Sequence, residues 1–216
     1  MKFIDWFAGI GGFRAGMESA GHECVGFCEF DRFATASYVS MHLLTDEQRQ
    51  KLSQMDFKKR QKEILKDEYR NGEWYASDIR RVCADDIPRA DCWCFGFPCQ
   101  DISVAEKMRG FKGNRSSLFF RVMYLLGQLR EEEKPAYLFI ENVKNLLSVN
   151  RGWDFARLLA EMDAGGMMQN GVFLTPKTSE CRRTERGCSL SDILETEVPQ
   201  RFFLSKEQML KIVLKP

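Results

Sequence analysis

The sequence predicts an α/β fold built on a mostly parallel, doubly wound sheet. Short apolar segments of strand length alternate along the chain with longer stretches whose apolar residues recur at helical spacing. Glycine or a capping side chain stands at several junctions, such as Gly21 after the first helical stretch and Asp31 before the second. This alternation favours parallel strands joined by right-handed crossovers. A chain of 216 residues with 44% apolar content is large enough to bury a real core.

The elements follow one another in a β-turn-α-β-α order from the N-terminus. Residues 45–71 are charged and free of proline, and their helical spacing predicts one or two surface helices inserted between core strands, ended by Asn71-Gly72. From about residue 166 the pattern weakens, which predicts an irregular C-terminal appendage with a last helix from Ser205. Strands are expected at 2–9, 22–30, 73–79, 90–97 and 136–142, and helices at 12–21, 31–43, 116–133, 143–148 and 153–166.

Composition and charge narrow the function classes. The net charge of +1 gives no global field for nucleic acid, so any such surface must be local. The first residues lack a charged segment ahead of an apolar run, and no apolar stretch approaches membrane-spanning length, so we expect a cytoplasmic protein without a signal peptide or membrane contact.

Eight cysteines in a reducing compartment require an interpretation other than disulfides. There is no C-x-x-C and there are only two histidines, so we expect no metal site. Apart from Cys99, the cysteines are expected to be small buried hydrophobes, with Cys92 and Cys94 on one face of a strand. These are Cys24, Cys28, Cys83, Cys92, Cys94, Cys181 and Cys188.

The turn after the first strand, FAGIGG (7–12), departs from the dinucleotide fingerprint because Arg14 stands where the third glycine belongs. It favours a ligand that lies close to the backbone but lacks a pyrophosphate. Glu29, at the end of the second strand, can accept hydrogen bonds from two ribose hydroxyls, and Asp78 from an exocyclic amine. This combination suits S-adenosylmethionine. The alternatives are that Glu29 is only a surface strand end and that Asp78 only caps the following turn.

In GFPCQDIS (96–103), Cys99 follows a strand at a turn where backbone amides can favour the thiolate and Pro98 fixes the backbone. Glu141 ends the neighbouring strand, next to Asn142, and can donate a proton. A thiolate and a protonated carboxyl are suited to adding a nucleophile across an electron-poor ring.

The segments DWFAGIGGFRAGMESAG, GFPCQDIS, GNRSSLFF and ENVKNLLS resemble the ordered motifs of the DNA cytosine carbon-5 methyltransferases, over about residues 1–166. The resemblance implies a Rossmann-like, S-adenosylmethionine-dependent methyltransferase fold. It implies that Cys99 is the nucleophile and Glu141 the acid in a reaction that flips cytosine out of double-stranded DNA. The implied cofactor-binding residues are Phe7, Gly9, Gly11, Gly12, Glu29, Phe30, Asp78, Ile79 and Pro98. The implied substrate-binding residues are Gln100, Ser103, Arg109 and Asn142. The loop 98–115 would close over the base, with phosphate contacts from Lys107, Arg109, Lys112 and Arg115.

The resemblance breaks after the DAGG helix. The family continues there with V-P-Q-x-R-x-R, whereas EVPQRFFLS (197–205) echoes this motif later in the chain and with only Arg201. We therefore expect a catalytic domain at 1–166 and a remnant of a target-recognition region at 167–216, with a second polypeptide as one source of the missing part. Two alternatives stay open: an RNA cytosine methyltransferase of the same family, and a catalytically incomplete subunit that binds cofactor or DNA.

Overall fold

The structure is a computed structural model that describes residues 1–97, 118–141, 151 and 153–167. The chain divides into two compact units. Among the described residues, the first unit contains 1–96 and 133–140, and the second contains the remainder.

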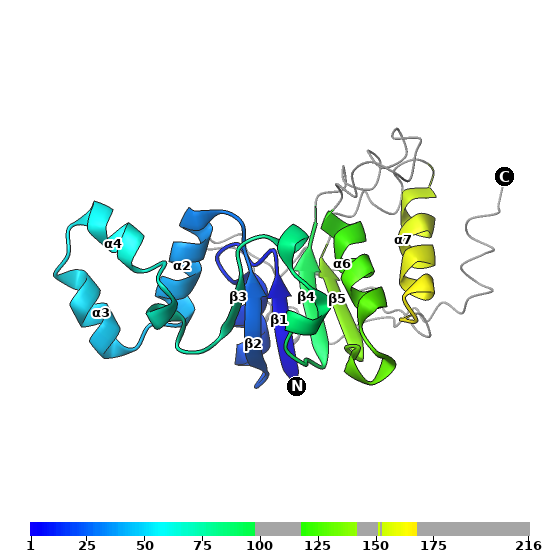
Figure 1. The fold of residues 1–216 in the computed structure, drawn as a ribbon, viewed down its shortest axis with the longest axis horizontal. Coiled ribbons are helices and arrows are strands. Elements are labelled where there is room, and N and C mark those ends of the chain that lie inside the picture. The colour runs from blue at the N-terminus through cyan, green and yellow to red at the C-terminus, as the bar shows by residue number, and fades with distance from the viewer. Residues whose placement is uncertain (98–117, 142–150, 152, 168–216) are drawn as a thin grey trace, which may run out of the picture. The chain divides into compact units, whose positions relative to one another are not determined.

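The sheet has five strands in the order β3-β2-β1-β4-β5 (Figure 1). β1 pairs in parallel with β2 and with β4, and β2 pairs in parallel with β3, so the carboxyl ends of these four strands share one edge. The chain moves outward from β1 to β3 and then returns to β4 on the other side of β1. Ligands bind at such a reversal in doubly wound sheets. The predicted α/β fold is confirmed, with strands β1 (Lys2–Trp6), β2 (Glu23–Cys28), β3 (Trp74–Ala76), β4 (Cys92–Gly96) and β5 (Tyr137–Glu141).

Helices α1 (Gly12–Ser19) and α2 (Arg32–His42) pack beside β1 and β2. Met17 of α1 joins a buried cluster with Phe3, and Tyr38 of α2 stacks on Phe27 with ring centroids 4.0 Å apart. The predicted N-cap of α2 is confirmed, because the Asp31 carboxylate accepts hydrogen bonds from two backbone N–H groups of the first turn.

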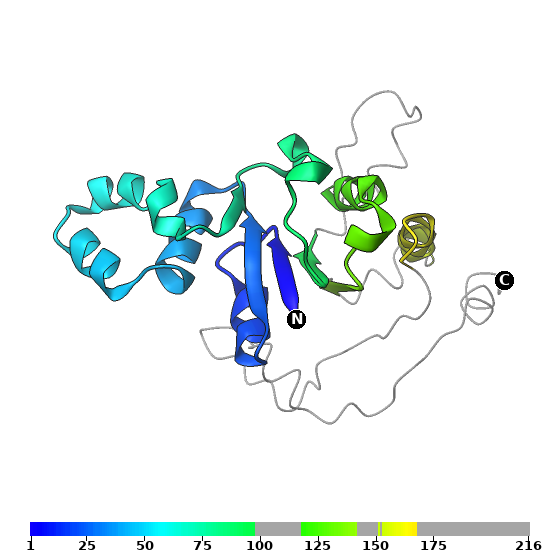
Figure 2. The same cartoon turned by 60° about the horizontal axis from the view of Figure 1, so that its bottom comes forward.

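The predicted insertion at 45–71 forms two α-helices and a short 3₁₀ helix: α3 (Asp46–Ser53), α4 (Phe57–Glu63) and η1 (Asp67–Arg70). The pair α3–α4 lies on the far side of α2 from the sheet in both views (Figures 1 and 2). Leu52, Ile64 and Tyr69 anchor the insertion in the same buried cluster as Tyr38. Asn71 and Gly72, both with left-handed φ angles, end it as expected and lead into β3. Two further 3₁₀ helices, η2 (Ile79–Arg81) and η3 (Ala84–Asp86), precede β4.

The second unit contains α6 (Leu118–Gln128) and α7 (Trp153–Ala164). Phe119 of α6 is buried, with its ring 5.0 Å from that of Phe97, and the Arg157 guanidinium of α7 lies 4.7 Å from the centre of the Phe120 ring. The helix expected through residue 133 ends at Gln128, directly after Gly127, which disfavours helix interiors, and the 3₁₀ helix η4 (Glu131–Glu133) follows.

Four of the described cysteines are buried as predicted, and the sulfur atoms of Cys92 and Cys94 lie 3.8 Å apart on one face of β4. The prediction is wrong for Cys83, which is exposed because it precedes the surface helix η3. Within the described part of the chain, no helix combines the length and the apolar character that crossing a membrane requires. The expected loop at 98–115, the helix at 143–148 and the C-terminal appendage lie outside the described residues.

Candidate functional site

The turn that follows β1 carries three residues in the left-handed region of backbone space. Phe7 has φ 56°, Gly9 has φ 55° and Gly11 has φ 90°. Glycine adopts these angles freely, whereas an L-residue such as Phe7 is held in them at a cost of about 1–2 kcal/mol. A Cβ at Gly11 would also overlap the His42 imidazole, while one at Gly12 would meet nothing. The turn therefore needs glycine at position 11 for two independent reasons.

The backbone carbonyl of the last β2 residue, the Glu29 side chain just beyond it and a side chain of α2 hold this turn in place. The Gly9 N–H donates to Glu29 Oε2 at 2.7 Å, and the Ala8 N–H donates to the Cys28 carbonyl at 3.0 Å. His42 Nε2 lies 2.9 Å from the Ile10 carbonyl oxygen. Because a carbonyl can only accept, Nε2 carries the proton, and burial lowers the pKa of His42. A neutral imidazole on α2 thus fixes the outer end of the turn.

Glu29 stands one residue beyond β2, where the sequence placed a ribose-binding carboxylate. Its second oxygen, Oε1, accepts the Asp31 N–H at 2.7 Å. Each carboxylate oxygen has two lone pairs, and each receives one backbone donor here, so one acceptor position on each oxygen remains for a ligand. Glu29 therefore organises the turn and retains the capacity to accept from a diol.

Next to Glu29, an aromatic ring and an ion pair line the same edge. Phe30 is 73% exposed, and the Arg80 guanidinium lies 5.4 Å from its ring centre. Asp78 binds the Arg80 fork through both oxygens, at 2.8 and 2.9 Å, and also accepts the Arg80 N–H as N-cap of η2. The pair holds the pKa of Asp78 below its ordinary value. Asp78 thus caps the following turn, as one of the two interpretations of it predicted, and Ile79 beside it is buried.

Sequence reasoning missed a group of buried polar side chains between the sheet and its helices, which we call the interior cluster: Asp5, Arg14, Tyr38 and Glu73. Arg14 Nη1 contacts both carboxylate oxygens of Glu73, at 2.7 and 2.9 Å, and lies 3.3 Å from the Tyr38 hydroxyl. Within the described residues, neither oxygen of Asp5 makes a hydrogen bond of normal geometry, and burial raises its pKa well above the ordinary range. The one sequence signal for this cluster was Arg14, an arginine at a position where the glycine motif has a glycine.

The expected catalytic residues are only partly within the described structure. Glu141 is the last residue of β5 and is exposed. Pro98, Cys99, Gln100, Ser103, Arg109 and Asn142 lie outside the described residues. The described structure thus brings together the cofactor-binding candidates Phe7, Gly9, Gly11, Gly12, Glu29, Phe30, Asp78 and Ile79 around the ends of β1, β2 and β3.

A parallel sheet whose strand order reverses beside a glycine turn places this chain among the doubly wound α/β proteins, a class that binds ligands at the carboxyl ends of its strands. A sequence model of the C-5 cytosine-specific DNA methylases matches residues 1–168, and the chain belongs to this family.

Individual relatives agree with this membership. The type II methyltransferase M.HhaI of Haemophilus parahaemolyticus is 36% identical over 152 residues, which cover 70% of this chain and 36% of that protein. M.HaeII of Haemophilus aegyptius is 33% identical over 234 aligned positions, covering 95% of this chain and 62% of that protein. The structure of a methyltransferase from Entamoeba histolytica superposes with a TM-score of 0.50 at 17% identity, covering 81% of this chain and 47% of that one, and supports the fold. The chain spans about a third of the length of the first relatives it matches.

Proposed function

We propose that this chain transfers a methyl group from S-adenosylmethionine to carbon 5 of cytosine in double-stranded DNA. The observation that carries the proposal is the family match over residues 1–168, which includes Cys99 and Glu141 in their expected motifs. The matched family acts on DNA by its description, which does not favour the RNA alternative.

The described edge offers suitable groups for the cofactor. Glu29 has acceptor positions for the ribose hydroxyls, and the exposed Phe30 ring can stack on adenine. Asp78 can accept from the adenine amine only by sharing an oxygen with Arg80, which engages both. When bound, the cofactor supplies an electrophilic methyl group on its sulfonium.

The residues of this chain would activate the base. The Cys99 thiolate adds to carbon 6 of a flipped cytosine while Glu141 donates a proton to ring nitrogen 3, which makes carbon 5 nucleophilic. After methylation, loss of the carbon-5 proton and departure of Cys99 restore the aromatic ring. Gln100, Ser103, Arg109 and Asn142 are proposed to contact the substrate, and Pro98 to border the cofactor.

For target recognition we propose a catalytic domain at 1–166, a remnant of a recognition region at 167–216, and a second polypeptide that completes it. The alignment with M.HaeII supports one part of this proposal, an internally shortened chain, because its 234 positions exceed the length of the chain and so require gaps within it. We further propose that the protein works in the cytoplasm as part of a restriction-modification system.

Covalent trapping tests the proposal. Duplex DNA containing 5-fluorocytosine, incubated with the protein and S-adenosylmethionine, should yield an adduct that survives denaturing electrophoresis, because fluorine at carbon 5 cannot leave as a proton does. Cys99→Ala should abolish the adduct. Cys83→Ala, which removes an exposed thiol elsewhere, should retain it.

Two further arms complete this experiment. Transfer RNA and DNA incubated side by side with labelled cofactor separate the two substrate classes. Absence of an adduct and of label transfer to either nucleic acid would contradict the proposed activity of this chain, and cofactor binding without turnover would favour the incomplete-subunit alternative.

A further inference from the structure

Helix α4 within the insertion is an unusually basic surface element. Four of its seven residues are cationic, with Glu63 as the single acid. None of its residues is buried, and Phe57 at its start is 68% exposed. The neighbouring α3 differs, because it has acidic residues in its first turn, a complete capping box and the buried Leu52. α3 therefore has the features of a structural helix, whereas α4 presents charge to solvent.

Two of the α4 cations face solvent on one side of the helix without compensation. Lys58 and Lys62 are four residues apart, so their side chains are neighbours on the helix surface. Neither forms an ion pair with any described residue, whereas Lys59 pairs with Asp56 at 3.7 Å and Lys66 pairs with Glu63 at 2.8 Å. No acidic residue lies three or four positions from Lys58 or Lys62 in the sequence.

Like charges at this spacing destabilise a helix, so the arrangement is unfavourable for stability alone. It is favourable for binding an anionic polymer, because two unpaired ammonium groups on one face can contact successive phosphates. With a chain charge of only +1, such a local patch is where nucleic-acid affinity must originate.

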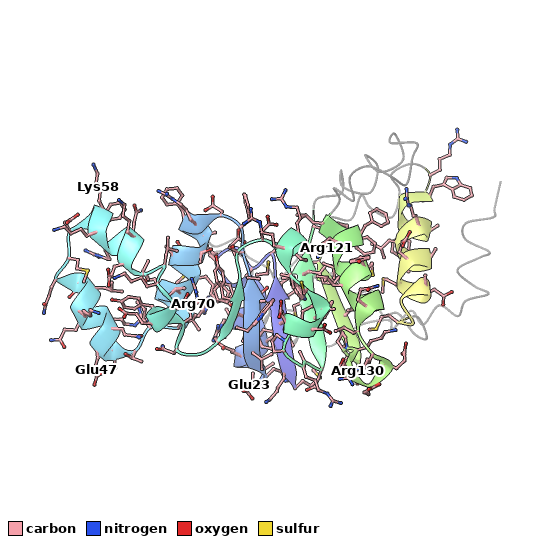
Figure 3. All side chains as sticks on the ribbon, viewed as in Figure 1. Glu23, Glu47, Lys58, Arg70, Arg121 and Arg130 are labelled. Atoms are coloured by element: carbon pink, nitrogen blue, oxygen red, sulfur yellow. The ribbon has the colours of Figure 1, made fainter. Side chains whose placement is uncertain are left out.

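The position of the patch agrees with this use. Lys58 extends from the end of the α3–α4 pair that lies on the same side as the carboxyl ends of the strands, whereas Glu47 extends from the opposite end (Figures 1 and 3). A duplex that offers a base at the carboxyl edge of the sheet approaches from the side to which Lys58 points.

We propose that Lys58 and Lys62 of α4 form a backbone-contacting site for duplex DNA, which makes the 45–71 insertion an accessory DNA-binding arm. The choice of DNA rests on the proposed function, while the charge arrangement is a property of the helix itself. Contacts of this type are independent of base sequence and strongly dependent on salt.

The test compares the salt dependence of binding in two charge-matched double variants. One is Lys58→Gln with Lys62→Gln, which keeps helix propensity because glutamine and lysine are nearly equal in it. The other is Lys2→Gln with Arg89→Gln, two exposed cations outside the insertion, at the start of β1 and just before β4. Each protein is titrated with a labelled duplex of about 30 base pairs at about 50 to 200 mM salt.

The Lys58/Lys62 variant should reduce the slope of log affinity against log salt by about 1.8, or about 0.9 for each phosphate that is no longer neutralised, while the Lys2/Arg89 variant leaves the slope unchanged. The melting temperature of the Lys58/Lys62 variant should equal or exceed that of the unmodified protein, because a like-charge pair has been removed. An unchanged slope in the Lys58/Lys62 variant, or an equal reduction in both variants, overturns the proposal.

Methyl transfer to the same duplex, measured in parallel, separates this inference from the proposed function. If the unmodified protein transfers methyl groups and the variant slope is unchanged, only the arm is wrong. If binding depends on Lys58 and Lys62 but no methyl is transferred, the arm stands and the proposed activity fails. If the unmodified protein binds no duplex, both fail.

Discussion

Two regions of the first unit pair an arginine with a carboxylate, and they differ in how much water reaches the pair. In the interior cluster, the side chains of Arg14 and Glu73 are 7% and 11% exposed. At the edge, those of Arg80 and Asp78 are 62% and 13% exposed. The same type of ion pair therefore has a different role in each region. The buried pair connects α1 to the residue before β3, while the exposed pair caps η2 beside the Phe30 ring.

The largest effect should follow loss of one partner of the buried pair. Glu73→Ala leaves Arg14 Nη1 buried without a carboxylate while Nε keeps its ion pair with Glu18, so the free energy of unfolding should fall by about 3 kcal/mol, the lower end of the range for breaking a buried pair. Urea denaturation followed by circular dichroism measures this. Glu73→Gln, which keeps an acceptor for Arg14, should cost less. A loss under about 1 kcal/mol for Glu73→Ala would place the buried pair in the same energetic class as the exposed one.

A glycine substitution in the turn should have the next largest effect. Gly11→Ala forces an L-residue into φ 90° and displaces His42 from the Ile10 carbonyl. The two terms should together cost about 2–3 kcal/mol of unfolding free energy. Gly12→Ala is the matched control, since its Cβ meets no atom, and should change stability by less than about 0.5 kcal/mol. Equal effects of the two substitutions would show that the backbone at Gly11 is not constrained in this way.

The buried carboxyl of Asp5 should make stability depend on pH. Its pKa is raised in the folded protein by burial, so the folded state holds a proton that the unfolded state releases above about pH 4. Its contribution is complete below the unfolded pKa and is lost as pH rises toward the folded pKa. Relative to Asp5→Asn, the unmodified protein should lose up to about 1.4 kcal/mol for each pH unit in that window. Denaturation curves for the two proteins at several pH values provide the measurement, and parallel pH profiles would contradict it.

The smallest effect is expected at the edge. Asp78→Ala removes an exposed ion pair and the cap of a three-residue 3₁₀ helix, and should cost no more than about 1 kcal/mol of unfolding free energy. Chemical denaturation beside Glu73→Ala gives a direct comparison. A loss as large as that of Glu73→Ala would remove the distinction between the two regions.

Local signals in the sequence predicted much of the fold and part of the candidate site at the carboxyl edge of the sheet. The glycine turn, the position of Glu29 after β2 and the Asp31 cap each depend on neighbouring residues and were predicted. The pairing of Arg14 with Glu73 joins residues 59 apart, and no local pattern reports such a contact. Asp78 was predicted as a strand-end acceptor, but β3 ends at Ala76 and Asp78 instead caps the next turn. Exposure of Cys83 depends on the path of a surface helix, which composition does not encode.

The strand order has a consequence for how the chain folds. β1 precedes both of its neighbours in the chain, and the two are synthesised at very different times. β2 follows β1 after one short helix. The other neighbour, β4, in which Cys92 pairs with Phe3, is separated from β1 by a stretch of chain that includes the whole insertion. Closing so long a loop is entropically costly and slow. During synthesis, one edge of β1 therefore stays unpaired until about residue 96 has emerged, and an unpaired strand edge is a template on which nascent chains can associate.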